Sequence, residues 1–403
     1  MIPGTQLLDP VVLDDPYPFY RRLRDEAPVW EIPGTGVFAV STFDRVAEAA
    51  GRVEDFSSNM HCLLYRDERG LPGRFQFGDA GGQALATADP PVHAVHRNAV
   101  FPELVATRMK TLEPDIVELA DMLVTRALGE QGVDFMGAIG NIVPITMINR
   151  LVGFRGSDLD ELWRSAVNGT RLVSGTLTLD ELIEVATGMA GVMAWVGEQL
   201  AGALEDPGDG LLGIVAGAVQ AGTLTESEAI SILTVLLSAG GETTTSLLGN
   251  AVRILAERPD LQEHLRSDPG QIANFAEEVL RLESPFRHMM RFVPRDTELG
   301  GTAIPADSTV LLLWGSANRD PLEFERPDEL DLRRQVLRRH VAFGRGIHHC
   351  VGAPLARIEA RAVLTVLLER TSSFCLEADS PPRWVRSFLV RRHEGLAVRL
   401  SPR

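Results

Sequence analysis

The stretch from Leu224 to Glu257 limits the possible folds of this chain more than any other part of its sequence. Thr225 and Glu228 form a capping box, in which both side chains bind free N–H groups at the start of a helix. The residues from Ile230 to Leu237 are apolar on almost every side, which is typical of a fully buried helix. At about 1.5 Å per residue, a helix of roughly 33 residues crosses a whole globular protein. The sequence therefore predicts a long central helix.

The middle of this predicted helix carries residues that weaken a helix. Gly240 and Gly241 each cost about 1 kcal/mol relative to alanine. Glu242 and the threonines 243–245 follow them directly. Two interpretations are open at this point: a neighbouring helix packs closely onto the glycines, or the segment is a functional site.

Helical periodicity also dominates the rest of the chain, whereas strand-like stretches are short. Glycine- and proline-rich loops are predicted at 70–82 and 206–209. There is no internal repeat and no low-complexity linker. We therefore expect one compact, mainly α domain over residues 1–403 with small β-sheets. The predicted helices are 43–50, 111–128, 179–204, 271–283 and 353–371, and the predicted strands are 29–40, 290–293, 309–314 and 397–400.

The composition excludes some classes of function. A net charge of −16 argues against nucleic acid as a partner, because phosphate binding needs clustered Lys and Arg. No apolar run reaches the roughly 18 to 20 residues that span a bilayer, and no signal peptide is visible, so we expect a cytoplasmic protein without a membrane anchor. Lys110 is the only lysine, which suggests the codon bias of a GC-rich genome such as that of an actinobacterium.

Three cysteines, Cys62, Cys350 and Cys375, lie far apart and do not suggest a disulfide framework. Cys350 stands out because three glycines surround it in the segment 343–352, just before a predicted helix with Pro354 at its start. A helix N-terminus stabilises a thiolate, and hydrogen bonds to the sulfur tune an iron ligand. Glycines also let the backbone lie flat against a planar cofactor.

Other interpretations of this loop are weaker. His348, His349 and Cys350 are all possible zinc ligands, but adjacent residues seldom converge on one tetrahedral metal and no further ligand motif is present. A nucleophilic cysteine is a second alternative, although no partner base is placed by the spacing.

The string from Phe343 to Gly352 resembles the cytochrome P-450 signature Phe-x-x-Gly-x-x-x-Cys-x-Gly, with no departure. The resemblance implies a P-450 fold whose long helix lies over haem b. It implies that Cys350 is the axial ligand of the iron and that Phe343 and Gly344 belong to the cofactor-binding loop. Further motifs in the expected order extend the resemblance over essentially the whole chain.

Glu278 and Arg281 are similar to the Glu-x-x-Arg motif of the family. Side chains three residues apart share a helix face and can form an ion pair. The resemblance implies that Arg326, in the string Phe-Glu-Arg-Pro, joins this pair in a buried structural network.

The Ala-Gly-Gly-Glu-Thr-Thr segment of the central helix is similar to the oxygen-activating segment of the family. The resemblance implies that Gly240 and Gly241 make room for dioxygen beside the haem, and that Glu242 and Thr243 relay protons. Many members have aspartate at the acid position, so Glu242 is a mild departure that keeps the carboxyl group.

Haem carries two propionates, which need cationic or hydrogen-bonding partners when they are buried. His93 and Arg97 are four residues apart and share a helix face. These two residues, together with Arg291 and His348, match propionate contacts of the family. Each of these residues alone would be ordinary, but together they occur at the positions that the other family motifs predict.

The implied reaction is insertion of one oxygen atom of O2 into an organic substrate. The chain has no flavin or iron–sulfur motif, so the resemblance implies electrons from NAD(P)H through a ferredoxin reductase and a ferredoxin. Arginines near the cysteine loop suggest a basic docking face for an acidic ferredoxin. They are Arg333, Arg334, Arg338, Arg339, Arg345, Arg357 and Arg361.

Segments that line the substrate pocket by analogy are rich in Leu, Phe and Met, which favours an apolar substrate. They are 63–77, 172–179, 236–239, 286–292 and 387–389. Two other functions remain as alternatives. Peroxide-driven relatives replace the acid–alcohol pair that Glu242 and Thr243 form here. A haem-binding sensor or ligand carrier without turnover would have no need of that pair.

Overall fold

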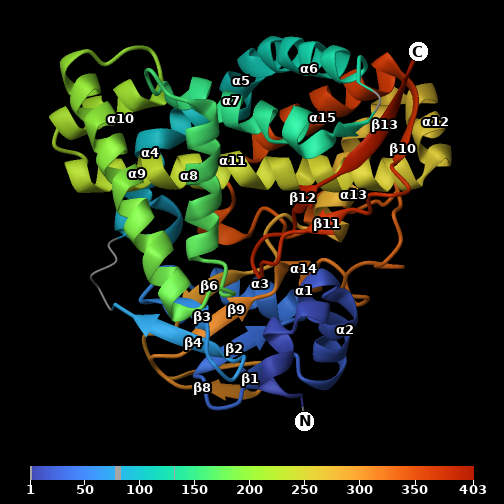
Figure 1. The fold of residues 1–403 in the computed structure, drawn as a ribbon. Coiled ribbons are helices and arrows are strands. Elements are labelled where there is room, and N and C mark those ends of the chain that lie inside the picture. The colour runs from blue at the N-terminus through green and yellow to red at the C-terminus, as the bar shows by residue number, and fades with distance from the viewer. Residues whose placement is uncertain (1, 78–82, 131) are drawn as a thin grey trace.

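The structure is a computed structural model that describes residues 2–77, 83–130 and 132–403. Figure 1 shows most helices on one side of the molecule and most strands on the other. Helix α11 (Glu226–Glu257) runs across the molecule between these two parts. The predicted class, mainly α with small β-sheets, is confirmed.

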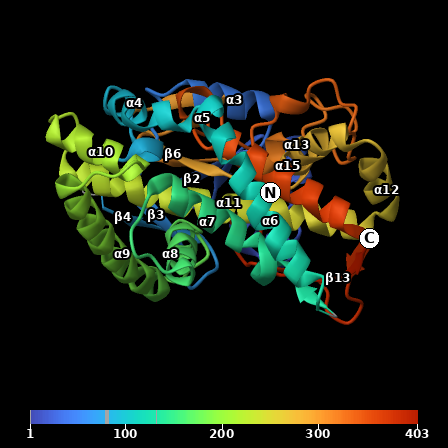
Figure 2. The same ribbon diagram turned by 90° about the horizontal axis from the view of Figure 1, so that it is seen from above.

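Helix α11 is the predicted central helix. The hydroxyl of Thr225 accepts a hydrogen bond from the N–H of Glu228, and the Glu228 carboxylate accepts one from the N–H of Thr225. Helices α7 (Ile142–Val152), α8 (Leu159–Leu172), α9 (Leu179–Glu205) and α15 (Ala353–Arg370) pack around it. Figure 2 shows α11 passing beneath several of these helices, which explains why it is apolar on nearly all sides.

The two glycines in α11 allow close helix packing. An ideal Cβ atom on Gly240 would lie 2.9 Å from Cδ1 of Ile148 in α7. One on Gly241 would lie 2.9 Å from the Cβ atom of Ala166 in α8. The packing interpretation therefore holds for both residues. Gly240 also lines the pocket described below.

The other predicted helices agree with the structure to within one or two residues at their ends: α3 (Phe43–Gly51), α6 (Glu113–Ala127), α9, α13 (Ile272–Leu282) and α15. Helices whose bounds were not predicted from the sequence are α1 (Pro10–Asp14), α2 (Tyr17–Glu26), α4 (Val92–Leu104), α5 (Ala106–Met109), α7, α8, α10 (Leu211–Gln220), α12 (Pro259–Ser267) and α14 (Trp314–Ala317). Residues 136–140 form a π-helical turn, and single 3-10 turns occupy Gly4–Leu8, Leu85–Thr87, Lys110–Leu112, Pro269–Gln271, Leu337–Arg339 and Gly346–His348.

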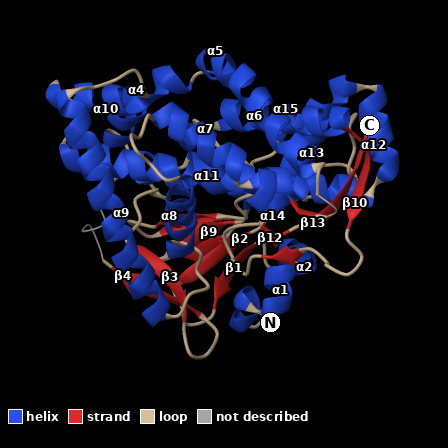
Figure 3. Cartoon of the chain, turned by 45° about the horizontal axis from the view of Figure 1, so that its top comes forward, coloured by secondary structure: helices blue, strands red, loops and turns tan. Residues whose placement is uncertain are grey.

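The largest of the described sheets has the strand order β1-β2-β9-β6. Its strands are β1 (Val29–Ile32), β2 (Val37–Val40), β6 (Met289–Phe292) and β9 (Thr309–Leu312). Strands β2 and β9 are parallel, and the other pairs are antiparallel. Figure 3 shows these strands on the face opposite the main helices. The sheet brings β6, and with it Arg291, toward α11.

Smaller sheets complete the fold. Strand β13 (Ala397–Pro402) lies between β10 (Thr371–Leu376) and β5 (Val133–Asp134). Among the described residues, two-stranded sheets pair β3 (Cys62–Arg66) with β4 (Pro72–Gln76), β7 (Thr297–Leu299) with β8 (Thr302–Ile304), and β11 (Arg383–Trp384) with β12 (His393–Gly395).

One strand prediction and one loop prediction differ from the structure. The stretch 29–40 is not one strand but a hairpin, because Gly34 and Gly36 have φ values of +72° and +66° that reverse the chain. Part of the predicted loop 70–82 is strand β4, and its residues 78–82 lie outside the described residues.

Candidate active site

A pocket lies between α11 and the loop that precedes α15. The pocket wall also includes residues of α4, α7, α13 and β6, so it depends on segments far apart in the chain. Most of the side chains that the sequence singled out line it. They are Cys350, His93, Arg97, Arg291, His348, Phe343, Gly344 and Thr243.

The loop before α15 presents Cys350 to this pocket. Gly344 and Gly346 have φ values of +70° and +74°, which a side chain would strain. The N–H of Cys350 donates to the carbonyl oxygen of Phe343 at 2.8 Å, closing the turn. The side chain of Cys350 is exposed, and the space it faces is the pocket.

Two opposing effects act on the sulfur. Because the pocket lies inside the protein, desolvation raises the pKa of the Cys350 thiol overall, although the N–H groups of Gly352 and Ala353 at the start of α15 act against this rise. Arg357 and Arg97 act in the same direction as the N–H groups. The helix terminus therefore favours a thiolate, and a metal cation bound to the sulfur would stabilise it further.

Arg291 is the clearest sign that the pocket binds an anion. It is 6% exposed, and burial lowers its pKa to about 10, with Asp89 opposing this change. Its guanidinium group donates to the carbonyl oxygen of Met290 at 2.7 Å. Among the residues that the structure describes, no carboxylate forms an ion pair with it. A buried, uncompensated cation is costly, so an anionic group of a ligand is the natural partner.

Two histidines lie beside this arginine site. The rings of His93 and His348 are 4.3 Å apart between centroids. Burial, together with Arg291, lowers the pKa of His348 to about 3, so this imidazole is neutral at pH 7. The Nε2 atom of His348 is buried and has no hydrogen-bond partner among the described residues. These groups fit a flat ligand that carries carboxylates, as haem does.

Arg97 holds the cysteine loop from the side of α4. Its Nη1 atom donates to the carbonyl oxygens of Ile347 and His349, at 3.1 Å and 3.0 Å. The guanidinium group of Arg357 lies 4.5 Å from the ring centre of Phe343 on the other side. Both arginines therefore help to fix the loop that carries the cysteine.

The central helix brings Thr243 but not Glu242 to the pocket. The Thr243 hydroxyl donates to the carbonyl oxygen of Ala239 at 2.8 Å, and Thr243 is one of the residues that line the pocket. Glu242 is 2% exposed and is not part of that wall. Its carboxylate accepts hydrogen bonds from Arg392 at 2.6 Å and from the hydroxyl of Thr170.

Sequence reasoning missed one carboxyl group that lines the pocket. Glu359 of α15 is 2% exposed, and burial raises its pKa to about 8, while a hydrogen bond with Thr244 acts in the opposite direction. It lies one helical turn after Leu355, on the apolar side of α15. A charged residue in an apolar helix face is the signal that could have identified it.

The Glu-x-x-Arg pair is buried as predicted, but its third member is different. Glu278 and Arg281 are both 0% exposed at their side chains and lie 2.7 Å apart. Arg334 supplies the other guanidinium group, 3.0 Å from the Glu278 carboxylate. Arg326 is 55% exposed and pairs with Glu329 and Asp331, so its predicted role in this network is wrong.

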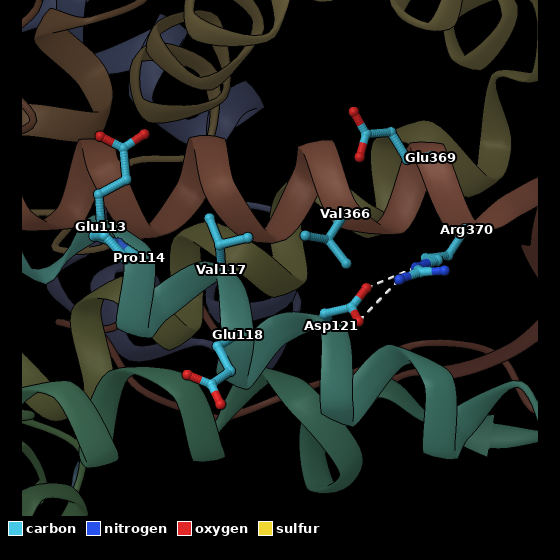
Figure 4. Close-up of a pocket in the computed structure, with 8 residues that line it drawn as sticks. All are labelled: Glu113, Pro114, Val117, Glu118, Asp121, Val366, Glu369 and Arg370. Atoms are coloured by element: carbon cyan, nitrogen blue, oxygen red, sulfur yellow. Dashed lines mark hydrogen bonds and ion pairs between the residues drawn. The ribbon is translucent and has the colours of Figure 1, made fainter.

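A second hollow lies on the surface between α6 and α15. Figure 4 shows Asp121 and Arg370 paired there, at 2.6 Å and 2.9 Å. The groove contains no sulfur and no histidine, so it does not offer the chemistry of the cysteine pocket. Its lining residues are Glu113, Pro114, Val117, Glu118, Asp121, Val366, Glu369 and Arg370.

The fold and the pocket together define a class: mainly α proteins with a pocket between a long central helix and a cysteine loop. A family model described as Cytochrome P450 matches residues 206–396. Cytochrome P450 144 of Mycobacterium tuberculosis is 42% identical over 96% of this chain and 89% of its own. Cytochrome P450 107B1 of Saccharopolyspora erythraea is 35% identical over 99% of this chain and 98% of its own. The chain therefore belongs to the cytochrome P450 family.

Solved structures agree with this assignment. CYP109E1 from Bacillus megaterium, in complex with testosterone, has a TM-score of 0.87 and 28% sequence identity over 97% of this chain and 99% of its own. A mutant of P450 EryK in complex with erythromycin B has a TM-score of 0.85 and 29% sequence identity, over 100% of this chain and 99% of its own. The P450 fold is thereby confirmed.

Family membership defines the general activity. The protein is a haem-thiolate monooxygenase that contains iron, uses O2 and receives electrons from redox partners. Within the described part of the chain, we find no helix whose length and hydropathy would let it cross a membrane.

Proposed function

We propose that this pocket binds haem b with the Sγ atom of Cys350 as the axial ligand of the iron. The observation that carries the proposal is that this cysteine and the buried Arg291 share one pocket wall. Arg291, His348, His93 and Arg97 would hold the propionates. Phe343 and Gly344 would support the ring from the cysteine side. Haem bound in this way supplies the reductive activation of O2.

The protein would supply protons from α11. The Thr243 hydroxyl lines the pocket, so rotation about its side-chain torsion can direct it at a ligand there. Glu242 follows Gly241 on the same helix and is the nearest acid to Thr243 in the sequence. General acid catalysis by a positioned group contributes about 10² to 10⁴ in rate, so loss of either residue should slow turnover strongly.

We propose an apolar organic substrate. Apart from Thr243 and Thr244, α11 presents only apolar or small residues to the pocket. Phe286 and Met289 contribute on the side of β6. A wall of this kind holds its ligand by burial of apolar surface and excludes water. The testosterone bound to the similar CYP109E1 is consistent with such a substrate.

Electrons would come from NAD(P)H through a ferredoxin reductase and a ferredoxin. Arg333, Arg338 and Arg345 near the cysteine loop are exposed and would form part of a basic docking face. Arg334 does not belong to this face, because it is buried against Glu278. Arg361, Arg357 and Arg339 pair closely with Glu113, Glu277 and Glu323, at 2.8, 2.5 and 2.8 Å. Arg338 lies farther, 3.8 Å, from its carboxylate neighbour Glu277.

The carbon monoxide difference spectrum of the dithionite-reduced protein tests haem binding and ligation together. We expect the strongly red-shifted Soret band of ferrous haem trans to thiolate. Cys350→Ala should lose this band, and Cys375→Ala, a change at an exposed cysteine outside the pocket, should keep it. An unshifted band would contradict thiolate ligation. Absence of a haem band from folded protein would contradict the whole proposal.

Turnover separates an enzyme from a haem sensor or carrier. A monooxygenase should consume NADH or NADPH and release an oxygenated product when a suitable ferredoxin, its reductase and a substrate are present. Tight binding of ligands with no reduction by any ferredoxin would instead favour a sensor.

A further inference from the structure

Leu85 adopts an unusual backbone conformation in the wall of the pocket. It lines the pocket together with Ala86 and is 5% exposed. Its φ value is +40°, in the left-handed region that a residue with a side chain rarely adopts. A strained backbone of this kind persists only where surrounding contacts hold it. Leu85 therefore needs a contact that keeps it in this conformation.

The side chain of His96 in α4 supplies such a contact. Its Nδ1 atom accepts a hydrogen bond from the N–H group of Leu85 at 3.2 Å. His96 is 0% exposed, so bulk water does not reach the imidazole. A buried N–H group without a partner is costly, and the ring therefore stabilises this backbone in its strained conformation.

The other nitrogen of the ring contacts the start of the central helix. The Nε2 atom of His96 lies 3.2 Å from Oε1 of Glu228. Because Nδ1 accepts from Leu85, the proton of the ring lies on Nε2, which donates to the carboxylate. Oε2 of Glu228 accepts from the N–H group of Thr225 at 2.8 Å, in the capping box of α11. The first turn of α11 thus fixes the orientation of the imidazole.

His96 is not part of the pocket wall, although its neighbours in α4, His93 and Arg97, are. It can therefore act on a bound ligand only through the residues that it holds. Leu85 is the residue to which its side chain is bonded on the pocket side, and Ala86 follows directly in the chain.

We propose that His96 is a positioning residue that fixes Leu85 and Ala86 in the pocket wall and thereby sets how well the apolar part of a ligand fits. The inference rests on the proposed haem site and apolar substrate. Loss of the Leu85 hydrogen bond lets the strained backbone relax, so a smaller fraction of molecules has a complete wall. A ligand that needs the wall then binds more weakly by that fraction.

A purely structural joint between α4 and α11 is the competing explanation. The two explanations differ in which ring nitrogen matters. Asparagine at position 96 places an oxygen near the position of Nδ1, so it can accept from Leu85 but is too short for Glu228. Glutamine places an amide nitrogen near the position of Nε2, so it can donate to Glu228 but offers no acceptor to Leu85.

The test compares His96→Asn, His96→Gln and the control His264→Gln in the haem-loaded protein. His264 is exposed in α12, so its change repeats the substitution away from the pocket. Imidazole and 4-phenylimidazole are the probes, and both bind haem iron through nitrogen and shift the Soret band. The second probe adds an apolar ring that the pocket wall must accommodate. The ratio of the two dissociation constants cancels effects on the haem itself.

We expect His96→Gln to lower the preference for 4-phenylimidazole over imidazole about tenfold, because it leaves a buried donor unpaired. His96→Asn should keep most of the wild-type preference, and His264→Gln should match wild type. Equal losses in the Asn and Gln variants, or an unchanged preference in His96→Gln, would overturn the proposal. Failure of the wild-type protein to bind haem and imidazole would instead contradict the proposed function.

Amide hydrogen exchange gives a readout that needs neither a ligand nor turnover. The peptide that contains Leu85 should exchange one amide faster in His96→Gln than in wild type. In His96→Asn this amide should remain protected. Equal protection in the Gln variant and wild type would show that His96 does not hold Leu85.

Glu228→Gln provides an independent check should His96→Gln fail to fold. Its amide oxygen can still accept from Nε2 of His96, and glutamine also serves in a capping box. Both the probe ratio and the protection of Leu85 should therefore stay as in wild type. Their loss would mean that a charged pair, and not the neutral ring bonded to Leu85, holds the wall, and the proposal would be wrong.

Discussion

Individual buried charges show most directly how this chain is adapted to a cofactor. Arg291 is buried with no carboxylate partner among the described residues, and His348 keeps a buried nitrogen free. Groups of this kind destabilise the protein alone and stabilise it once a ligand supplies the missing partner. The energetic effect of such a residue should therefore differ in sign between the haem-free and haem-loaded forms.

Arg291→Gln should weaken haem binding. A hydrogen bond to a charged group contributes about 1.5 to 3 kcal/mol, so we expect haem to dissociate roughly 10- to 100-fold more readily. The haem-free protein should be no less stable than wild type, because the variant no longer buries an unpaired charge. Haem transfer to apomyoglobin and urea unfolding measure the two effects.

Arg295→Gln is the matched control, because Arg295 is 60% exposed and pairs with Glu54 and Asp55 at the surface. It should leave haem transfer unchanged. A comparable loss of haem in both variants would show that Arg291 has no special role.

Glu359 should make stability depend on pH. Its folded pKa, raised to about 8, lies above the ordinary value of 4.5, so the folded state holds a proton that the unfolded state releases between these values. The contribution of Glu359 to stability is therefore largest below pH 4.5 and falls as pH rises to 8, by at most about 1.4 kcal/mol per pH unit. Glu359→Gln should remove this decrease.

Urea unfolding of both proteins across pH 5 to 9 gives the difference directly, since all other groups are shared. As pH rises, the free energy of unfolding of the variant should increase relative to that of wild type, and this difference should become constant above pH 8. A constant difference between the two proteins would mean that the folded pKa of Glu359 is not raised.

At the scale of helices and loops, the buried ion pairs connect segments that are distant in the chain. Arg334 follows a region without regular structure and inserts into the Glu278–Arg281 pair of α13. Arg326 has a φ value of +46°, a left-handed backbone conformation, and its side chain points to exposed partners. The backbone path, more than the residue type, decides which arginine is buried.

Arg334→Gln should lower the free energy of unfolding by about 3 to 5 kcal/mol, because it leaves a buried carboxylate with less compensation. Arg326→Gln removes an exposed arginine and should cost less than about 1 kcal/mol. Urea unfolding monitored by circular dichroism measures the free energy of unfolding of both variants and of wild type. Similar effects of the two substitutions would restore the original assignment of Arg326.

The whole molecule is acidic, with a net charge of −16, yet it exposes arginines near the cysteine loop. Opposite charges on a docking face speed association, and salt weakens this effect. An acidic ferredoxin approaching there would be attracted locally while the rest of the surface repels it. The orientation of docking would then depend on a few exposed arginines.

Arg338→Glu should slow reduction by a ferredoxin and flatten the dependence of the rate on salt. Arg338 is 75% exposed and lies 3.8 Å from Glu277, which has Arg357 and His340 as closer partners, so the fold should tolerate the change. Arg383 lies in strand β11 and is 72% exposed, so Arg383→Glu is the control and should slow reduction less. Stopped-flow reduction at several salt concentrations makes the comparison. Equal rates in both variants and wild type would exclude docking at Arg338.

The sequence alone determined the features that depend on local patterns. The capping box and apolar run predicted α11, and the spacing around Cys350 predicted the loop before α15. The ends of the helices predicted from the sequence were close to the observed ends for the same reason, because helix caps and periodicity depend on residues that are near one another in the chain. The resemblance also selected side chains that the structure brings to one pocket, from Thr243 to His348.

Only the tertiary structure decided which distant groups meet. It placed Arg334 rather than Arg326 beside Glu278, brought Glu359 into the pocket wall, and paired Glu242 with Arg392. These contacts join residues separated by long stretches of chain, and no local periodicity encodes them. Burial sets the pKa values and the cost of each unpaired charge, and burial exists only after the segments have packed together.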